Sequence, residues 1–276
     1  MRLALLALAA LPLAAFAADV SADAPWQDRP DFSAGQWAGF ATESLSSDGV
    51  KLTVAIPATP APGRPWVLAV GGMGYHGEVE KELLARGYHV ANAEAFMLYG
   101  AKPALDAMDR LYTEARARYK LAPRCVLRGV SRAGLALYRY AGLHPERVAC
   151  IFAEGPVMDF RTWPGTRPEF AGEWRDIKRH YGFKSDAEAL AFREQPLDRL
   201  PILAKAKIPI LHIVGPEDRI VPADTNTHEA ARRFKKMGYA GMQVIVHEGP
   251  TSMQGHACPL TELPRVIEFI TQHTAP

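Results

Sequence analysis

The chain has 276 residues, of which 48% are hydrophobic and 22% charged, and its net charge is +2. This composition is typical of an ordinary globular protein with one sizeable core. A net charge this close to zero is not that of a strongly basic protein, so we expect no nucleic-acid partner and no membrane partner. Apart from a proline-rich stretch at 57–65, the sequence has no low-complexity tract, internal repeat or coiled-coil heptad.

Residues 1–18 are typical of a secretory signal peptide. A single positive charge, Arg2, precedes an apolar run from Leu3 to Phe16, and Ala15-Phe16-Ala17 matches a small-x-small cleavage signal. The run is too short for a comfortable membrane span. We therefore predict cleavage near Ala17-Ala18 and a periplasmic or extracellular protein of residues 19–276. A retained N-terminal anchor or a buried helix is the alternative.

Three cysteines do not make a disulfide framework in a chain of this length. Cys125 opens one apolar run and Cys150 lies within another, so the two can be bridged only if those runs are neighbouring strands. We favour buried free thiols. Cys258 has no partner in either case.

The chain begins with polar and antiparallel features. Residues 19–39 are mostly polar and interrupted by prolines, so we expect them to wrap the surface. The runs Phe40–Leu45 and Lys51–Ile56 flank Asp48-Gly49, a dipeptide that favours a tight hairpin turn. This pattern predicts an antiparallel pair at the edge of a sheet.

From Trp66 onward, short apolar runs alternate with helical stretches. The apolar runs are Trp66–Val70, Tyr88–Ala93, Cys125–Leu127, Val148–Ala153, Ile208–Val214 and Met242–Val246. The helical stretches are Glu78–Arg86, Pro103–Tyr119, Arg132–Leu143, Asp224–Met237 and a last helix around Leu263, Val266, Ile267 and Ile270. Near-continuous apolar strands separated by helices predict a single α/β domain, with a mostly parallel central sheet covered on both faces.

Residues 156–201 break this alternation. The segment is too long for a turn and is rich in Trp, Arg and Pro. We predict a short helical insertion over the C-terminal edge of the sheet, in the position of a lid. A purely structural excursion is the alternative.

A candidate nucleophile lies where a strand meets a helix, in Gly129-Val130-Ser131-Arg132-Ala133. A serine on such a sharp turn needs small residues two positions before and after it, because strand and helix approach closely there. The pattern resembles the Gly-x-Ser-x-Gly elbow of the α/β-hydrolase superfamily, with Ala133 in place of the second glycine. The alternative is a structural role for Ser131, as the N-cap of the following helix.

Two later loops resemble the acid and base loops of the same superfamily. Asp218 follows a buried strand in a Gly-x-x-Asp loop, and His256 follows Gly255 in the loop between the last strand and the last helix. The order nucleophile, acid, base is the one that α/β-hydrolases use. Glu154 and Asp159 are rival acids, because some members place the acid one strand earlier. Glu217, next to Asp218, is a less suitable acid because it looks exposed, and His247, at the end of the last strand, is a less suitable base.

The loop after Trp66–Val70 contains Gly71-Gly72-Met73-Gly74, where the superfamily supplies an oxyanion donor. The resemblance assigns the donors to the N–H of Arg132 and to that of Gly72 or Met73. The same loop also has the Gly-x-Gly-x-x-Gly spacing of a dinucleotide-binding site, with Glu94 about twenty residues on. A preceding hairpin and the export signal argue against that alternative, which also leaves the three triad residues unexplained.

The resemblance implies a Ser-His-Asp hydrolase that needs no metal or organic cofactor. The chain is similar to exported bacterial hydrolases encoded with polysaccharide-degrading enzymes, so we expect a carboxylic ester on a carbohydrate or another small molecule. Tyr75, Trp163 and Trp174, with Tyr99 and Arg161, are candidate substrate-binding residues. A prolyl-peptidase-like peptidase and a non-catalytic binding protein on the same scaffold are the alternatives.

Overall fold

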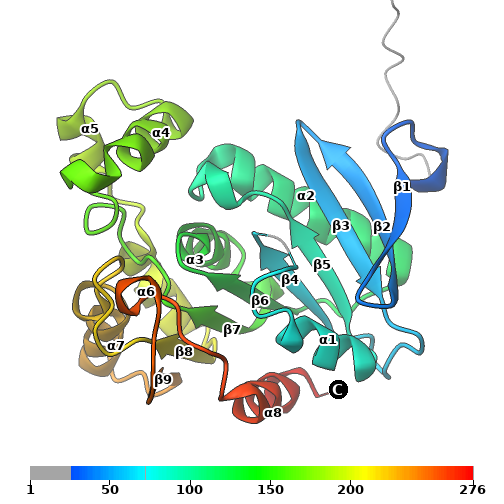
Figure 1. The fold of residues 1–276 in the computed structure, drawn as a ribbon. Coiled ribbons are helices and arrows are strands. Elements are labelled where there is room, and N and C mark those ends of the chain that lie inside the picture. The colour runs from blue at the N-terminus through cyan, green and yellow to red at the C-terminus, as the bar shows by residue number, and fades with distance from the viewer. Residues whose placement is uncertain (1–25, 72, 276) are drawn as a thin grey trace, which may run out of the picture.

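The computed structural model describes residues 26–71 and 73–275. In this part of the chain, nine strands form one sheet in the order β1-β2-β3-β5-β4-β6-β7-β8-β9 (Figure 1). Their bounds are β1 Ser33–Trp37, β2 Phe40–Ser47, β3 Val50–Ile56, β4 Trp66–Val70, β5 His89–Ala93, β6 Cys125–Val130, β7 Val148–Glu154, β8 Ile210–Val214 and β9 Met242–Val246. The predicted signal peptide, residues 1–18, lies outside the described residues.

The helices alternate with the strands from β4 onward. Their bounds are α1 Glu78–Ala85, α2 Lys102–Tyr119, α3 Ala133–Leu143, α4 Ala171–Tyr181, α5 Asp186–Ala191, α6 Pro196–Lys205, α7 Thr227–Lys236 and α8 Leu263–Thr274. Short 3₁₀ turns include η2 Phe96–Leu98 and η6 Met253–Gly255. No helix among the described residues is long and apolar enough to cross a membrane.

Six neighbouring strands, from β5 through β4 to β9, run parallel, which confirms the predicted α/β sheet. Strands β2 and β3 form the predicted hairpin, and Asp48 and Gly49 at its turn have φ of 49° and 80°. Positive φ at both central residues gives the turn a twist that matches the flanking strands. Residues Ser33–Trp37 pair with β2 outside the hairpin, so β1 and not β2 is the edge strand.

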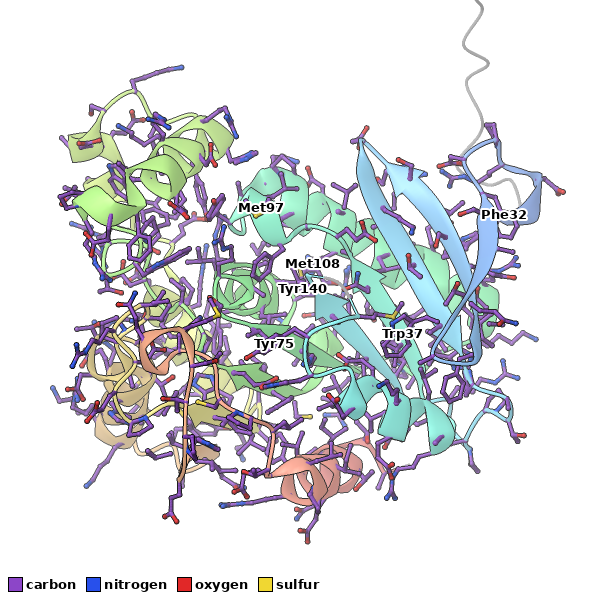
Figure 2. All side chains as sticks on the ribbon, viewed as in Figure 1. Phe32, Trp37, Tyr75, Met97, Met108 and Tyr140 are labelled. Atoms are coloured by element: carbon purple, nitrogen blue, oxygen red, sulfur yellow. The ribbon has the colours of Figure 1, made fainter. Side chains whose placement is uncertain are left out.

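The two faces of the sheet have separate apolar cores. Helices α1 and α8 cover one face, and α2, α3, α6 and α7 cover the other (Figure 1). Met108 of α2 and Tyr140 of α3 belong to the second core (Figure 2). Cys125 lies in one core and Cys150 in the other, so the sheet separates the two sulfurs and both thiols are free.

The segment predicted as a helical insertion divides into two parts. Helices α4 and α5 project beyond the end of the sheet (Figure 1), and residues around Phe160 form their own small core with Trp163 and Trp174. Helix α6 instead packs on α3 and α7 and contributes Leu197, Leu200 and Leu203 to the main core. The projecting part is therefore 156–195, shorter than the predicted 156–201, and is called the helical segment below.

Candidate active site

Ser131 occupies a strained turn between β6 and α3. Its φ is 54°, a value that non-glycine residues rarely adopt. Two backbone hydrogen bonds hold it there, from Ser131 N–H to the carbonyl of Glu154 (2.8 Å) and from Val157 N–H to the carbonyl of Ser131 (2.9 Å). A Cβ on Gly129 would lie 2.7 Å from the Cβ of Ala133. The elbow thus needs a glycine before the serine and tolerates an alanine after it.

The structure brings Ser131, His256 and Asp218 into one hydrogen-bonded chain. Nε2 of His256 lies 2.9 Å from Oγ of Ser131, and Nδ1 lies 2.6 Å from Oδ2 of Asp218. A carboxylate at Nδ1 favours the tautomer that leaves Nε2 free to accept a proton. Oδ1 of the buried Asp218 accepts the backbone N–H groups of Ile220 and Val221, which fixes its orientation.

The acid and base loops are in backbone contact with each other. Arg219 N–H donates to the carbonyl of Gln254 at 3.0 Å. A Cβ on Gly215 would lie 1.9 Å from the carbonyl oxygen of Gly255, so only glycine fits at this approach. These contacts hold Asp218 and His256 together although 38 residues separate them in sequence.

The rival acids have other partners. Glu154 pairs with Arg128 (3.0 Å) and with His76, while Asp159 accepts hydrogen bonds from Arg161. Glu217 is exposed, and His247 is buried just after β9. Among the described residues, Asp218 is thus the carboxylate in place to orient His256.

The segments that carry the predicted oxyanion donors follow two parallel strands that end side by side. Val70 of β4 is level with Gly129 of β6, so the loop that contains Met73 follows its strand beside the Ser131 turn. The N–H of Arg132 lies at the start of α3, where helix amides have no partner within the helix. Gly72, the other predicted donor, lies outside the described residues.

A buried charge cluster, which no motif in the sequence predicts, lies behind this loop. Arg128 is paired with Glu80 (3.1 Å) and Glu154 (3.0 Å), and it donates to the carbonyl of Tyr75 (3.1 Å). His76 also contacts Glu154. Burial raises the pKa of Glu80, and the Arg128 guanidinium opposes that shift. The cluster ties the loop that contains Met73 and Tyr75 to β6 and β7.

The three predicted substrate-binding aromatics differ in position. Tyr75 (Figure 2) is 44% exposed and stacks on His76. Trp174 is buried and donates to Asp186, so it stabilises the helical segment. Trp163 is also buried, but its ring contacts the guanidinium of Arg132 at 4.9 Å.

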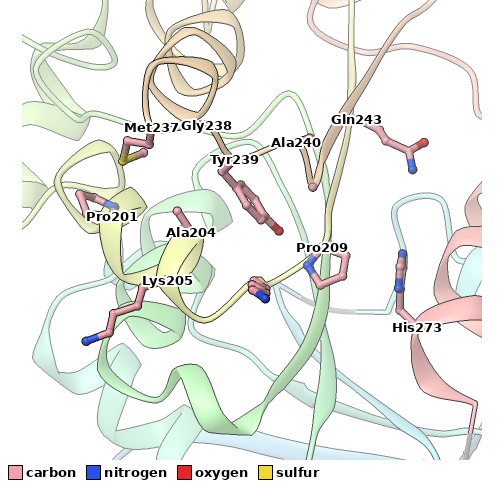
Figure 3. A pocket seen from close by; sticks show the side chains of 12 residues that line it. Pro201, Ala204, Lys205, Pro209, Met237, Gly238, Tyr239, Ala240, Gln243 and His273 are labelled. Atoms are coloured by element: carbon pink, nitrogen blue, oxygen red, sulfur yellow. The ribbon is translucent and has the colours of Figure 1, made fainter.

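A depression of about 390 Å³ lies beside the base loop. It is lined by Tyr75, His76, Pro250, Thr251, Ser252, Ala257, Cys258 and Pro259. Burial raises the pKa of the Cys258 thiol to about 11, so this neighbour of His256 stays protonated at neutral pH. A larger hollow of about 710 Å³ lies by Pro209 and Gly241, before β8 and β9 begin, and is therefore at the edge opposite to the triad (Figure 3).

The described residues contain no group of three or more His, Cys, Asp or Glu side chains arranged to hold a metal ion. No protein-family model matches the chain, and no curated protein matches its sequence.

Solved structures do resemble it. A puromycin-hydrolyzing peptidase from Mycobacterium tuberculosis has a TM-score of 0.67 and 16% identity over 86% of this chain. The present chain spans only 40% of that peptidase. MPT51 (FbpC1) of the same organism has a TM-score of 0.61 and 13% identity, over 88% of this chain and 98% of its own. A candidate lipase from Acinetobacter baumannii AYE has a TM-score of 0.55 and 14% identity, over 88% of this chain and 92% of its own. Similarity at this level of identity establishes a shared fold.

Proposed function

Since the chain has the α/β-hydrolase fold, we propose that it is a serine hydrolase that cleaves a carboxylic ester of a carbohydrate or another small molecule. The observation that carries this proposal is the hydrogen-bonded chain from Ser131 through His256 to Asp218. The strained φ of Ser131 supports it, because strain of this kind is retained where a side chain must be presented to a substrate.

In this mechanism Oγ of Ser131 attacks the ester carbonyl while Nε2 of His256 takes its proton. Asp218 stabilises the resulting imidazolium, and the Arg132 N–H with a donor from the Met73 loop binds the oxyanion. His256 then protonates the alkoxide as the C–O bond breaks, which leaves an acyl group on Ser131. A water molecule, deprotonated by His256, attacks that acyl group, and the acid and free serine are released.

We also propose that the protein is exported, on the basis of the signal-peptide pattern in residues 1–18. Peptide cleavage is the second candidate, because one structural neighbour is a puromycin-hydrolyzing peptidase. The same triad serves both reactions, so the leaving group decides between them.

The test is hydrolysis of p-nitrophenyl acetate and butyrate, and of aminoacyl p-nitroanilides, by residues 19–276. We expect ester cleavage that is lost in Ser131→Ala and kept in Ser185→Ala, a serine that caps α5 away from the triad. Faster cleavage of the anilides would favour the peptidase. Ester cleavage that survives Ser131→Ala would contradict the serine mechanism.

A further inference from the structure

The side chain that follows the nucleophile lies in a cage of aromatic rings. The guanidinium carbon of Arg132 is 5.1 Å from the ring centres of Phe96 and Tyr99 and 4.9 Å from that of Trp163. Phe96 and Tyr99 come from the η2 turn after β5, whereas Trp163 comes from the helical segment. Rings at this distance stabilise a cation through its faces and leave its N–H edge for hydrogen bonds.

Those hydrogen bonds are only partly satisfied. The Arg132 side chain is 16% exposed, and its ion pair, to Glu173 of α4, is 4.0 Å long. Nη1 donates to the hydroxyl of Tyr99 at 3.0 Å and lies 3.4 Å from the sulfur of Met97. Its Nε is buried without a hydrogen-bond partner among the described residues, as are those of Arg128, Arg139 and Arg199, so the difference lies in the ion pairs.

Other arginines of low exposure in the described chain are paired much more closely. Their shortest ion pairs are 3.1 Å for Arg29 with Glu114 or Asp31, 3.0 Å for Arg128 with Glu154, 3.0 Å for Arg139 with Glu194 and 3.0 Å for Arg199 with Glu194. A guanidinium withdrawn from water needs a close anion to offset the cost of desolvation. Arg132 therefore lacks the close anion that each of these other arginines has.

The position of Arg132 indicates which part of a substrate supplies that partner. His256 must reach the leaving oxygen to protonate it, so the alcohol lies on the side of the base loop and its depression. Arg132 contacts the η2 turn and the helical segment instead. The acyl group thus extends toward Arg132, past the exposed side chain of Met97, which offers an apolar surface to a short methylene spacer.

We propose that Arg132 selects esters whose acyl group ends in a carboxylate, such as monoesters of short dicarboxylic acids. This inference rests on the proposed ester hydrolysis. A planar guanidinium held by rings binds a carboxylate through two parallel hydrogen bonds, and Arg is suited to this role where Lys is not.

The test compares monomethyl glutarate with methyl pentanoate, which have acyl chains of equal length, through the methanol that each releases. We expect wild type to favour the glutarate ester in kcat/KM by about tenfold or more. Arg132→Gln should remove that preference; because both esters use the same oxyanion donors, the ratio isolates the side chain. Glu173→Gln should raise the preference, since it removes the competing carboxylate. Arg167→Gln, an arginine stacked on Phe170 that contacts the Ile220 carbonyl, should leave the ratio unchanged.

A binding measurement separates this inference from the proposed function. Glutarate should quench the tryptophan fluorescence of Ser131→Ala through Trp163, and should not do so when Arg132→Gln is added. Binding without hydrolysis of either ester would support the carboxylate site and contradict ester hydrolysis. Equal hydrolysis of both esters, or glutarate binding that survives Arg132→Gln, would overturn the inference and leave the serine mechanism in place.

Discussion

Gly155, the residue after β7, lies directly against His256. A Cβ at Gly155 would be 3.3 Å from Cε1 of the imidazole and 3.6 Å from Oδ2 of Asp218, and the φ of Gly155 is 47°. The end of β7 therefore packs against the imidazole of His256. The imidazole fits there because Gly155 has no side chain. Asp218 and His256 themselves come from the loops after β8 and β9.

Gly155→Ala should reduce kcat/KM by up to about 100-fold, because the added methyl group displaces the imidazole from Ser131. Gly182→Ala is the matched control. Gly182 has a φ of 75°, and a Cβ there meets no atom within 4 Å. Both variants should lose about 1 kcal/mol of unfolding free energy, because a Cβ is strained at positive φ, and only Gly155→Ala should lose activity. Equal activities of the two variants would show that the contact with His256 does not matter.

Asp218→Asn should lower kcat by about 10,000-fold, because an amide does not hold Nδ1 of His256 as the donor. Asp159→Asn should keep most of the activity, since Asp159 bonds Arg161 and not the base. Steady-state kinetics on p-nitrophenyl acetate measures both. The reverse order of losses would place the acid at the end of the preceding strand.

His212 should make folding sensitive to acid. It is fully buried between Tyr138 (2.5 Å) and Thr227 (2.9 Å), and burial lowers its pKa from 6.5 to about 3. The unfolded chain binds the proton first, so stability is complete above pH 6.5. It falls by about 1 kcal/mol per pH unit as the pH drops toward 3.

Denaturant unfolding at pH 7, 6 and 5 measures this slope. His212→Gln, which can still bond both neighbours, should have a smaller slope than wild type. His228→Gln, a surface residue beside Asp224, should keep the wild-type slope. An unchanged slope in His212→Gln would rule out this residue as the source of the acid sensitivity.

Removal of the cation from the buried charge cluster around Arg128 should destabilise the fold strongly. Arg128→Gln leaves Glu80 and Glu154 buried without their cation, so we expect a loss of about 3–5 kcal/mol in unfolding free energy. Arg86→Gln removes an exposed pair with Glu82 and should cost less than about 1 kcal/mol. Similar midpoints in urea for the two variants would contradict this difference.

Much of the fold could be predicted because periodicity reports local burial. The parallel strands and their helices lie within a few residues of their predicted bounds, and the hairpin turn at Asp48-Gly49 follows from dihedral preference alone. Strand β1 was missed because Ser33–Trp37 is polar, contains a glycine and is mostly exposed, so it has no apolar alternation. Strand β1 pairs with β2 because β3 occupies only one edge of β2 and leaves the other edge open.

The proximity of Ser131, Asp218 and His256 could be predicted because each residue follows a strand in a recognisable loop, and parallel strands bring their carboxyl ends together. The surroundings of these three residues could not be predicted from the sequence. The burial of Trp174, the pairing of Arg128 with Glu80 and the cage around Arg132 depend on which segments meet in space. Composition does not distinguish Trp163 from Trp174, but of the two it is Trp163 that contacts Arg132, the residue after Ser131.

The most direct test of the serine mechanism is fluorophosphonate labelling, read by peptide mass spectrometry. An activated serine is phosphonylated without any need to match the natural substrate. We predict a single modified peptide that carries the label on Ser131, and no label in Ser131→Ala or His256→Ala. An unlabelled wild-type protein, or a label on another residue, would contradict the assignment of Ser131, His256 and Asp218 as a catalytic triad.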